Sequence, residues 1–332
     1  MERRIIGGKP PAAAPGTSAA PAPAVLRLTV DEAGEGQRLD NFLLRLLKGV
    51  PKTHVYRVIR SGEVRVNKGR ASADTRLALG DEVRVPPVRT AQRDAAAPAP
   101  AREFPIVFED EQLLVVDKPA GVAVHGGSGV SFGVIEQLRR ARPQARFLEL
   151  VHRLDKETSG LLMVAKKRSA LTALQDQLRQ RETGKSYLAL VPGAWPEKLK
   201  VIDVPLHKFL TGEGERRVRA AEAGHEEAKR SITLVKVARR FRDFTLLEVT
   251  IKTGRTHQIR VHLAHAGHAI VGDPKYGDFA LNKAQARGPA RFERMFLHAW
   301  RLRFTHPAGG AEIELEAPLP AECEAFLSTL AA

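Results

Sequence analysis

The stretch HRLDKETSGLLMVAKK, His152–Lys167, decides how the rest of the sequence is interpreted. It places one carboxylate, Asp155, between an arginine and a lysine, and continues with Thr158-Ser159-Gly160 and an apolar run. A lone carboxylate beside two cations is usually one end of a surface ion pair. The apolar segments on either side, however, predict two buried strands that place Asp155 on the loop between them, where functional groups concentrate. The small polar residues beside it also favour a functional role.

The composition is that of a globular protein with an excess of positive charge. The chain has 332 residues, 43% hydrophobic and 27% charged, which is enough for more than one domain. Lys plus Arg number 53 against 38 Asp plus Glu, a formal charge of +15, which favours nucleic acid over an anionic membrane as partner. No apolar run has the length of a membrane-spanning helix. The single cysteine, Cys323, excludes an internal disulfide and favours a cytoplasmic location.

Two segments rich in alanine and proline divide the chain. Residues 1–36 predict a disordered tail, with a transit peptide as the alternative, and residues 89–103 predict a linker. We therefore expect a small domain over 37–88 and a large domain over 104–332. Strands dominate the large domain without a repeated strand-helix-strand pattern, so we predict an α+β fold with a mostly antiparallel sheet.

The small domain predicts two helices packed on a few strands. The first helix has apolar residues on one face, and the second opens at Pro51. Strands are expected over 63–67 and 82–86. Residues 37–86 hold 11 Lys or Arg and 5 Asp or Glu, a difference of +6, which favours a nucleic-acid surface over a merely solvated face. The inward residues would be Leu39, Phe42, Leu43, Leu46, Leu47, Val55, Val58 and Ile59, and the outward cations of the second helix Lys52, Arg57 and Arg60.

In the large domain, paired strands are predicted within 106–121, and further strands over 185–191 and 244–252. A helix over 169–179 would be capped by Ser169, with Leu171, Leu174 and Leu178 inward. A second helix over 256–267 would be capped by Thr256 and ended by Gly267, with Ile259 and Leu263 inward.

Several spaced motifs resemble those of a known enzyme family. HRLDKETSGLLMVAKK, GKSYLALV (184–191) and TGRTHQIRVH (253–262), with DKPAGVAVHGG (117–127) and GDPKYG (272–277), resemble the motifs of pseudouridine synthases of the large-subunit ribosomal RNA type. QRLDNFLLRLL, YRVIRSGEVRVN and GDEVRV resemble the S4 RNA-binding domain. The likeness covers about residues 37–330 and is strongest to family members that modify several sites of 23S rRNA, although GHEEAKRSITLVK departs somewhat from the pattern.

The resemblance implies roles for named residues. It implies that Asp155 is the essential catalytic residue, that Tyr187 is the active-site tyrosine, and that Arg260 pairs with the catalytic Asp. We further expect Arg153 and His257 to contact RNA, together with Lys52, Arg57 and Arg60. The implied partner is ribosomal RNA, bound by a monomer without a membrane or a small-molecule cofactor.

The implied chemistry explains these residue types. Pseudouridine formation breaks the N1–C1′ bond of uridine, turns the uracil and rejoins it through C5, without redox change. No phosphate loop or dinucleotide fingerprint is present in the sequence, and no cofactor is expected. An ionised Asp155 either attacks the sugar carbon or removes a sugar proton, and Arg260 would favour its charged form. Arg153 would reach a phosphate or fill the gap left by the extruded base.

Two other classes of protein are weighed against this enzyme. An S4-type RNA-binding or ribosome assembly factor without chemistry would not need a carboxylate among bases. A metal-dependent hydrolase would use the four histidines near the third motif, but no H-E-x-x-H and no cysteine accompanies them, so we expect phosphate contacts or surface positions and no metal. HGGSG (125–129) lacks the full nucleophile elbow that Ser128 would need in an esterase. The four histidines are His257, His262, His265 and His268.

Overall fold

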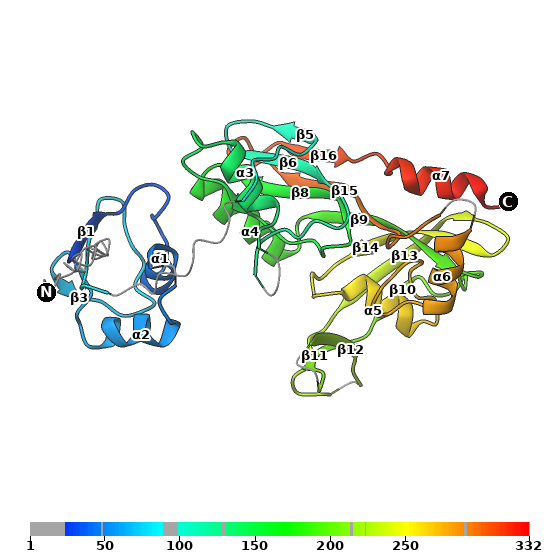
Figure 1. The fold of residues 1–332 in the computed structure, drawn as a ribbon, viewed down its shortest axis with the longest axis horizontal. Helices are drawn as coiled ribbons and strands as arrows, with labels where there is room; N and C mark the ends of the chain where they lie inside the picture. The colour runs from blue at the N-terminus through cyan, green and yellow to red at the C-terminus, as the bar shows by residue number, and fades with distance from the viewer. Residues whose placement is uncertain are drawn as a thin grey trace, which may run out of the picture. The chain divides into compact units, whose positions relative to one another are not determined.

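The computed structural model describes residues 24–47, 49–88, 99–127, 131–212, 215–222, 224–288 and 291–331. The chain divides near residue 94 into two compact units, and we describe an N-terminal unit up to residue 88 and a C-terminal unit from residue 99 (Figure 1). Most of the predicted linker and the first 23 residues of the predicted tail lie outside the described residues. No helix in the described ranges is long and apolar enough to cross a membrane.

The N-terminal unit packs two helices on a four-stranded sheet, as predicted. Seven of the eight residues expected to point inward are buried in one hydrophobic cluster. They are Leu39, Phe42, Leu43, Leu47, Val55, Val58 and Ile59. The strand order is β1-β4-β2-β3. The elements are β1 Leu26–Thr29, α1 Leu39–Leu46, α2 Lys52–Arg60, β2 Arg65–Val66, β3 Gly69–Arg70 and β4 Glu82–Val85.

Three details of the N-terminal unit differ from the predictions. β1 pairs with β4 and Val30 is 1% exposed, so a disordered tail up to residue 36 is wrong from residue 24 onward. The alternation of Leu26, Leu28 and Val30 is the signal of this strand. Leu46 is 39% exposed and does not point inward, and the strand expected over 63–67 pairs only at Arg65–Val66.

The C-terminal unit is built on one ten-stranded sheet, which confirms the α+β fold class. Eight strands lie in the order β10-β13-β14-β9-β15-β8-β6-β5, while β7 pairs with β8 and β16 with β15. All neighbours run antiparallel except β8 and β15. The strands are β5 Ile106–Glu109, β6 Leu113–Lys118, β7 Glu149–Leu150, β8 Ser159–Ala165, β9 Gly184–Pro192, β10 Val201–Asp203, β13 Ile232–Arg240, β14 Phe244–Ile251, β15 Leu297–Thr305 and β16 Glu312–Glu316.

Two helices explain why β6 and β8 each contain a run of consecutive apolar residues. Leu114 and Val116 of β6 pack into the cluster that includes α3 (Val134–Ala141), whereas Leu113 and Val115 pack into the cluster that includes α4 (Arg168–Gln180). Because both faces are covered, the strands do not alternate between apolar and polar residues. The helix predicted from Ser169 begins one residue earlier, and its N-cap is Lys167 without a side-chain hydrogen bond, so the predicted cap is wrong.

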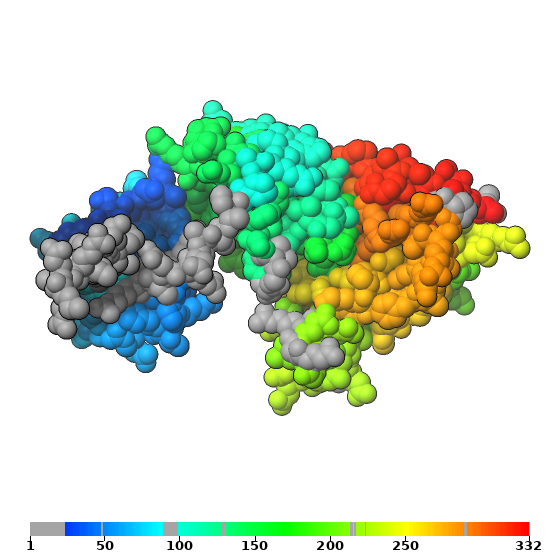
Figure 2. Space-filling model, viewed as in Figure 1, coloured from blue at the N-terminus to red at the C-terminus, as the bar shows by residue number. Residues whose placement is uncertain are grey.

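The other half of the sheet carries α5 (Gln258–His265), α6 (Phe279–Arg287) and α7 (Ala321–Thr329) (Figure 1). A separate two-stranded hairpin, β11 (Leu206–Leu210) and β12 (Arg216–Ala220), projects from the body of this unit (Figure 2). Its base is held on α5 by a small apolar cluster of Leu206, Val218 and Val261. The hairpin therefore has a fixed base next to the start of α5.

The segment Thr158-Ser159-Gly160 forms a tightly packed joint between strands. Thr158 and Ser159 are 2% and 1% exposed, and the Ser159 hydroxyl lies 2.9 Å from Nδ1 of His298 on β15. Gly160 has a φ of +107°, and a Cβ there would lie 2.3 Å from the carbonyl oxygen of Ala299. Thr158 lines the cavity beside Asp155, whereas Ser159 and Gly160 are held by the close contact between β8 and β15, which requires small residues.

We predict that Gly160→Ala lowers the free energy of unfolding by about 3 kcal/mol, because strained backbone and a steric clash add together. Gly193→Ala is the matched control, since Gly193 also has a positive φ of +73° but open space around its Cβ position. The control should lose only about 1 kcal/mol from backbone strain. Urea unfolding of both variants measures the difference, and equal losses would show that the joint accommodates a methyl group.

Candidate active site

One cavity of about 870 Å³ in the C-terminal unit collects the residues singled out from the large-domain motifs. Its lining includes the loop between β7 and β8, the first half of β9, the segment after β14 and the start of α5. Its volume lies within the range of small-ligand pockets, and a nucleotide is of that class. The predicted residues among its lining are Arg153, Asp155, Tyr187, His257 and Arg260.

The remaining predicted RNA contacts lie elsewhere. Lys52, Arg57 and Arg60 are exposed on the outer face of α2 in the N-terminal unit, while Val55, Val58 and Ile59 of the same helix are buried. Arg57 has an ion-pair partner, Glu63, at 3.6 Å. The structure thus places these three cations together on one exposed helix face.

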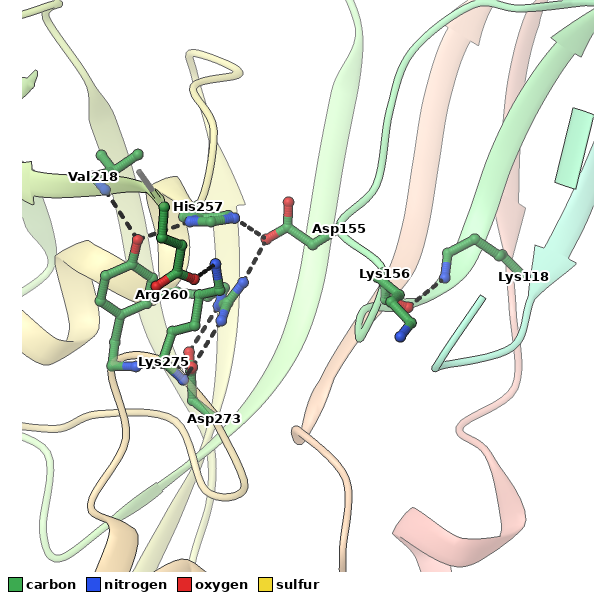
Figure 3. A network of polar contacts seen from close by, with 10 residues as sticks. Lys118, Asp155, Lys156, Val218, His257, Arg260, Asp273 and Lys275 are labelled. Carbon is green, nitrogen blue, oxygen red and sulfur yellow. Dashed lines mark hydrogen bonds and ion pairs between the residues drawn. The ribbon is translucent and has the colours of Figure 1, made fainter. Parts of the chain in front are cut away.

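Arg260 bridges two carboxylates (Figure 3). Its Nη1 donates to Oδ2 of Asp155 at 3.1 Å, and its Nε and Nη2 donate to the two oxygens of Asp273, each at 2.8 Å. The bidentate pair with Asp273 fixes the plane of the guanidinium, since fork-to-fork geometry leaves it little freedom. One N–H group consequently remains directed at Asp155.

The inner half of this network is deeply buried. Arg260 is 3% exposed and Asp273 is fully buried. Burial opposes the charge of both groups, but their mutual hydrogen bonds raise the pKa of Arg260 above its usual value and hold the pKa of Asp273 below its own. The backbone N–H groups of Lys275 and Tyr276 also donate to Asp273. Arg260 is therefore a permanent, oriented cation beside the more exposed Asp155.

A histidine and a tyrosine extend the network on the same side of Asp155 as Arg260. Nε2 of His257 lies 3.9 Å from Oδ2 of Asp155, and its Nδ1 lies 2.8 Å from the Tyr276 hydroxyl, which accepts a hydrogen bond from the N–H of Val218 on β12 (Figure 3). Burial lowers the pKa of His257, so its ring is neutral at pH 7. When the tyrosine donates to Nδ1, the ring proton lies on Nε2 and faces Asp155.

The start of α5 differs from the prediction. The N-cap is His257 with a φ of +53°, a conformation uncommon outside glycine, and Thr256 does not cap the helix. Instead, the Gln258 side chain orders the turn: its Oε1 accepts from the Thr253 hydroxyl and the N–H of Arg255, and its Nε2 donates to the Ile232 carbonyl. This turn orients His257 and Arg260 toward the cavity.

Tyr187 lies on β9 and is 7% exposed. Burial and the nearby negative charge of Asp155 raise the pKa of its phenol well above the usual value. The hydroxyl therefore stays protonated at neutral pH. The cavity consequently has a flat, neutral aromatic ring within the influence of the Asp155 charge.

Lys118, at the end of β6, stabilises the loop that carries Asp155 and lies on the side of this loop away from Arg260 (Figure 3). Its ammonium group donates to the carbonyl oxygens of Pro119, Val122 and Lys156, at 2.8, 2.8 and 3.1 Å. Burial lowers its pKa to about 7, while the three acceptors favour the charged form, which alone has three N–H donors. Lys118 thus fixes the backbone directly after Asp155.

The histidine of the opening motif is a neutral structural group. Nε2 of His152 accepts a hydrogen bond from the backbone N–H of Met163 on β8 at 3.1 Å, which requires an unprotonated Nε2. Burial, helped by the positive charge of Lys185, lowers the pKa of His152 to about 3. The imidazole therefore has no exchangeable charge to offer at neutral pH.

The lowered pKa of His152 predicts that the folded protein loses stability in acid. Because the folded-state pKa lies below the unfolded value near 6.5, the unfolded state gains a proton first as pH falls, and stability is lost between pH 6.5 and 3. His152→Gln keeps an acceptor for Met163 but does not titrate. On going from pH 7.5 to 5.5, the wild type should lose about 1 kcal/mol more free energy of unfolding than the variant. Equal losses in urea unfolding at both pH values would contradict the neutral assignment.

Of the four histidines near the third motif, the three besides His257 have different surroundings. His265 is exposed on α5, as expected. His262 is fully buried between the Thr233 hydroxyl and the Val204 carbonyl, so the expected surface position is wrong for this residue. His268 bonds the Pro192 carbonyl. Among the residues that the structure describes, no group of three or more His, Cys, Asp or Glu side chains has the arrangement of a metal site, and Ser128 lies outside them.

Sequence reasoning assigned no role to Asp273, Tyr276, Gln258 or Lys118. Asp273 and Tyr276 lie in GDPKYG, and Lys118 lies in DKPAG, so each belongs to a motif that was noticed. The sequence feature that could have pointed to these residues is a charged or hydroxyl-bearing side chain within a short segment that contains glycine and proline. Their connection to Asp155 depends on contacts between residues 38 and 105 positions apart in the chain, which periodicity does not contain.

Comparisons with known proteins agree with this geometry. The family model for RNA pseudouridylate synthase matches residues 112–265, and that for the S4 domain matches residues 37–83. Ribosomal large subunit pseudouridine synthase C of Escherichia coli (strain K12) is 50% identical over 305 residues, covering 90% of this chain and 94% of that protein. The protein of the same name from Yersinia pestis is 52% identical over 303 residues, covering 90% and 93%.

Among solved structures, human RNA Pseudouridylate Synthase Domain Containing 4 matches with a TM-score of 0.55 and 27% identity, covering 68% of this chain and 92% of that one. Human RNA Pseudouridylate Synthase Domain Containing 1 matches with a TM-score of 0.53 and 28% identity, over 67% and 86%. Sequence identity across most of the chain and structural similarity over about two thirds of it lead to the same assignment. The chain belongs to the RNA pseudouridylate synthase family and carries an S4 domain ahead of its synthase domain.

Proposed function

We propose that the protein isomerises several specific uridines of 23S ribosomal RNA to pseudouridine, with Asp155 as the essential catalytic residue. The observation that supports this most strongly is the pairing of Asp155 with an oriented, buried Arg260 inside a cavity of nucleotide size. The substrate is inferred from the relatives named for the large ribosomal subunit. We place the reaction in the cytoplasm, on a monomer that uses neither cofactor nor metal.

The cavity suits a base that has been extruded from an RNA helix. Asp155 is 26% exposed and Tyr187 lines the same cavity, so a base must be extruded from its stack to reach both. Tyr187 would supply a flat face for the uracil. The Arg153 side chain is exposed at the cavity and has no hydrogen bond or ion pair within the described chain, which suits a role at a phosphate or in the gap left by the base.

Two roles for Asp155 are consistent with this site. As a nucleophile it would attack C1′ and displace uracil, as carboxylates do in retaining glycosidases. As a base it would remove a sugar proton and release uracil by elimination. Both routes require an ionised carboxylate, and the N–H of Arg260 stabilises that charge. In both, the detached uracil turns in the cavity, rebinds through C5 and finally loses its C5 proton.

The S4 domain would anchor the RNA through phosphates. We predict that replacing Lys52, Arg57 and Arg60 together by Ala weakens binding to ribosomal RNA and lowers the slope of log affinity against log salt by roughly one for each lost phosphate contact. The rate at saturating RNA should stay unchanged, because these side chains lie on α2 and the cavity belongs to the other unit. Unchanged affinity and salt slope would show that this helix face is not an RNA anchor.

Carbodiimide mapping of pseudouridines tests the proposed function in cells. In large-subunit RNA from a deletion strain, particular pseudouridines should be missing, and the wild-type gene should restore them. A gene carrying Asp155→Asn should restore none. A complete set of pseudouridines in the deletion strain would overturn the assignment and favour an S4-type assembly factor without chemistry.

A further inference from the structure

Lys185 is a cation of the cavity to which the mechanism above gives no role. It lies on β9 two residues before Tyr187, and both side chains line the cavity, whereas Ser186 between them bonds Thr250 on the neighbouring strand. This alternation places Lys185 and Tyr187 on the same face of the strand. The ammonium group of Lys185 makes no hydrogen bond and no ion pair within the described part of the chain.

An unpaired ammonium in a partly closed site is costly to keep. Lys118, which is fully buried in the same unit, shows the usual solution, with three carbonyl partners around its ammonium. Lys185 has no comparable partners, and burial lowers its pKa. Removing it should therefore cost the fold little, which argues that its charge serves a ligand.

No carboxylate of the described residues lies within ion-pair distance of the Lys185 ammonium group. The imidazole of His152 is neutral because it accepts a hydrogen bond from the Met163 N–H. Gly254 has no side chain to offer, and a Cβ built on it would lie 3.6 Å from the Lys185 ammonium nitrogen. The charge of Asp155 is already paired with Arg260. The Lys185 ammonium group consequently has no anionic partner in the described protein, and the substrate can bring the negative charge that it lacks.

We propose that Lys185 is a catalytic residue that contacts the flipped uracil and stabilises the negative charge which the ring acquires when the N1–C1′ bond breaks. This rests on the proposed function. The electron pair of that bond passes to uracil N1, and the charge spreads over the ring nitrogens and carbonyl oxygens. When C5 bonds to C1′ and the C5 proton leaves, N1 takes up a proton and the ring is neutral again. Lys185 keeps its own proton throughout.

The position of Lys185 favours the base over a phosphate. It shares a strand face with Tyr187, which is 7% exposed, whereas the backbone phosphates of a flipped nucleotide remain toward solvent. Charge that develops only during bond cleavage also gains most from a cation fixed in advance in a poorly hydrated site. The expected effect is therefore on the rate of the chemical step, with little effect on RNA affinity.

The test compares Lys185→Met, Lys185→Arg and the control Lys236→Met, which removes an exposed lysine from β13. Tritium release from RNA labelled at C5 of uridine gives the single-turnover rate at saturating RNA, and titration at several salt concentrations gives affinity. Lys185→Met should slow the rate by about 100-fold, in the range found for one stabilising donor. Its affinity should stay within about twofold, with an unchanged salt slope, and Lys185→Arg should recover part of the rate.

Charge rescue separates chemistry from packing. Lys185→Cys treated with 2-bromoethylamine regains an amine of nearly the original length, because the thiolate displaces bromide. The chain's own Cys323 is buried and burial raises its pKa to about 12, so it should not react. The rate of Lys185→Cys should be low and should rise at least tenfold after treatment.

Three outcomes would overturn the proposal for Lys185. A Lys185→Met rate within threefold of wild type would exclude a role in the chemical step. A normal rate with a salt slope lowered by about one would identify a phosphate contact. A slow Lys185→Cys variant that aminoethylation does not rescue would indicate packing. Failure of the proposed function is distinguished because the wild type itself would then release no tritium.

Discussion

Asp155→Asn should abolish isomerisation while leaving RNA binding nearly intact. The carboxamide has the shape of the carboxylate and can still accept the hydrogen bond from Arg260, but it is neither a nucleophile nor a base. We expect the single-turnover rate to fall by at least about 10³-fold, roughly 4 kcal/mol of activation free energy. Stability should change little, because Asp155 is 26% exposed and Arg260 keeps Asp273 as its main partner.

The matched control is Glu157→Gln, which neutralises another carboxylate on the same loop. Glu157 lies beside Lys156 at 3.9 Å and is 32% exposed, and it is not part of the cavity lining. Its variant should keep the wild-type rate within about twofold. A rate for Asp155→Asn within tenfold of wild type, a barrier change of only ~1.4 kcal/mol, would contradict the catalytic assignment.

Arg260→Ala should have the second large effect, on stability and activity together. It leaves Asp273 as an unpaired, fully buried carboxylate, and breaking a buried pair in this way costs about 3–5 kcal/mol. It also removes the countercharge of Asp155. Thermal unfolding and tritium release from labelled RNA measure the two losses separately.

A double variant distinguishes these two roles. Arg260→Met combined with Asp273→Asn removes the buried charge along with its partner, so most of the lost stability should return. Activity should not return, because Asp155 still lacks its oriented cation. A stable double variant with the wild-type rate would show that Arg260 serves only to neutralise Asp273.

Periodicity and motif order predicted a large share of this fold. The α+β class, both helices of the N-terminal unit, α4, α5 and the loop position of Asp155 follow from apolar patterns that local sequence contains, whereas α3, α6 and α7 were not predicted. The resemblance added Arg260, and the structure brings its guanidinium to Asp155 across 105 positions of sequence. The catalytic roles of Asp155, Tyr187 and Arg260 remain predictions until the variants are measured.

The failed predictions have different physical causes. Helix caps at Ser169 and Thr256 were inferred from residue type, but the first turns are ordered by neighbouring backbone and by Gln258 instead. Thr158-Ser159-Gly160 has a polar composition, yet contact with β15 buries it. At Thr158-Ser159-Gly160 a packing partner distant in the chain overrides a local preference, whereas at the start of α5 the nearby Gln258 side chain makes the ordering hydrogen bonds.

The most direct test of the central claim is tritium release by the purified wild-type protein from large-subunit ribosomal RNA labelled at C5 of uridine. Moving the glycosidic bond to C5 expels the hydrogen there, so each isomerised uridine releases one tritium into water. The account predicts release that ends at a small whole number of tritium atoms per RNA, without added nucleotide, metal or redox cofactor, and none with Asp155→Asn. A folded wild-type protein that binds this RNA and releases no tritium, or an equally active Asp155→Asn variant, would contradict it.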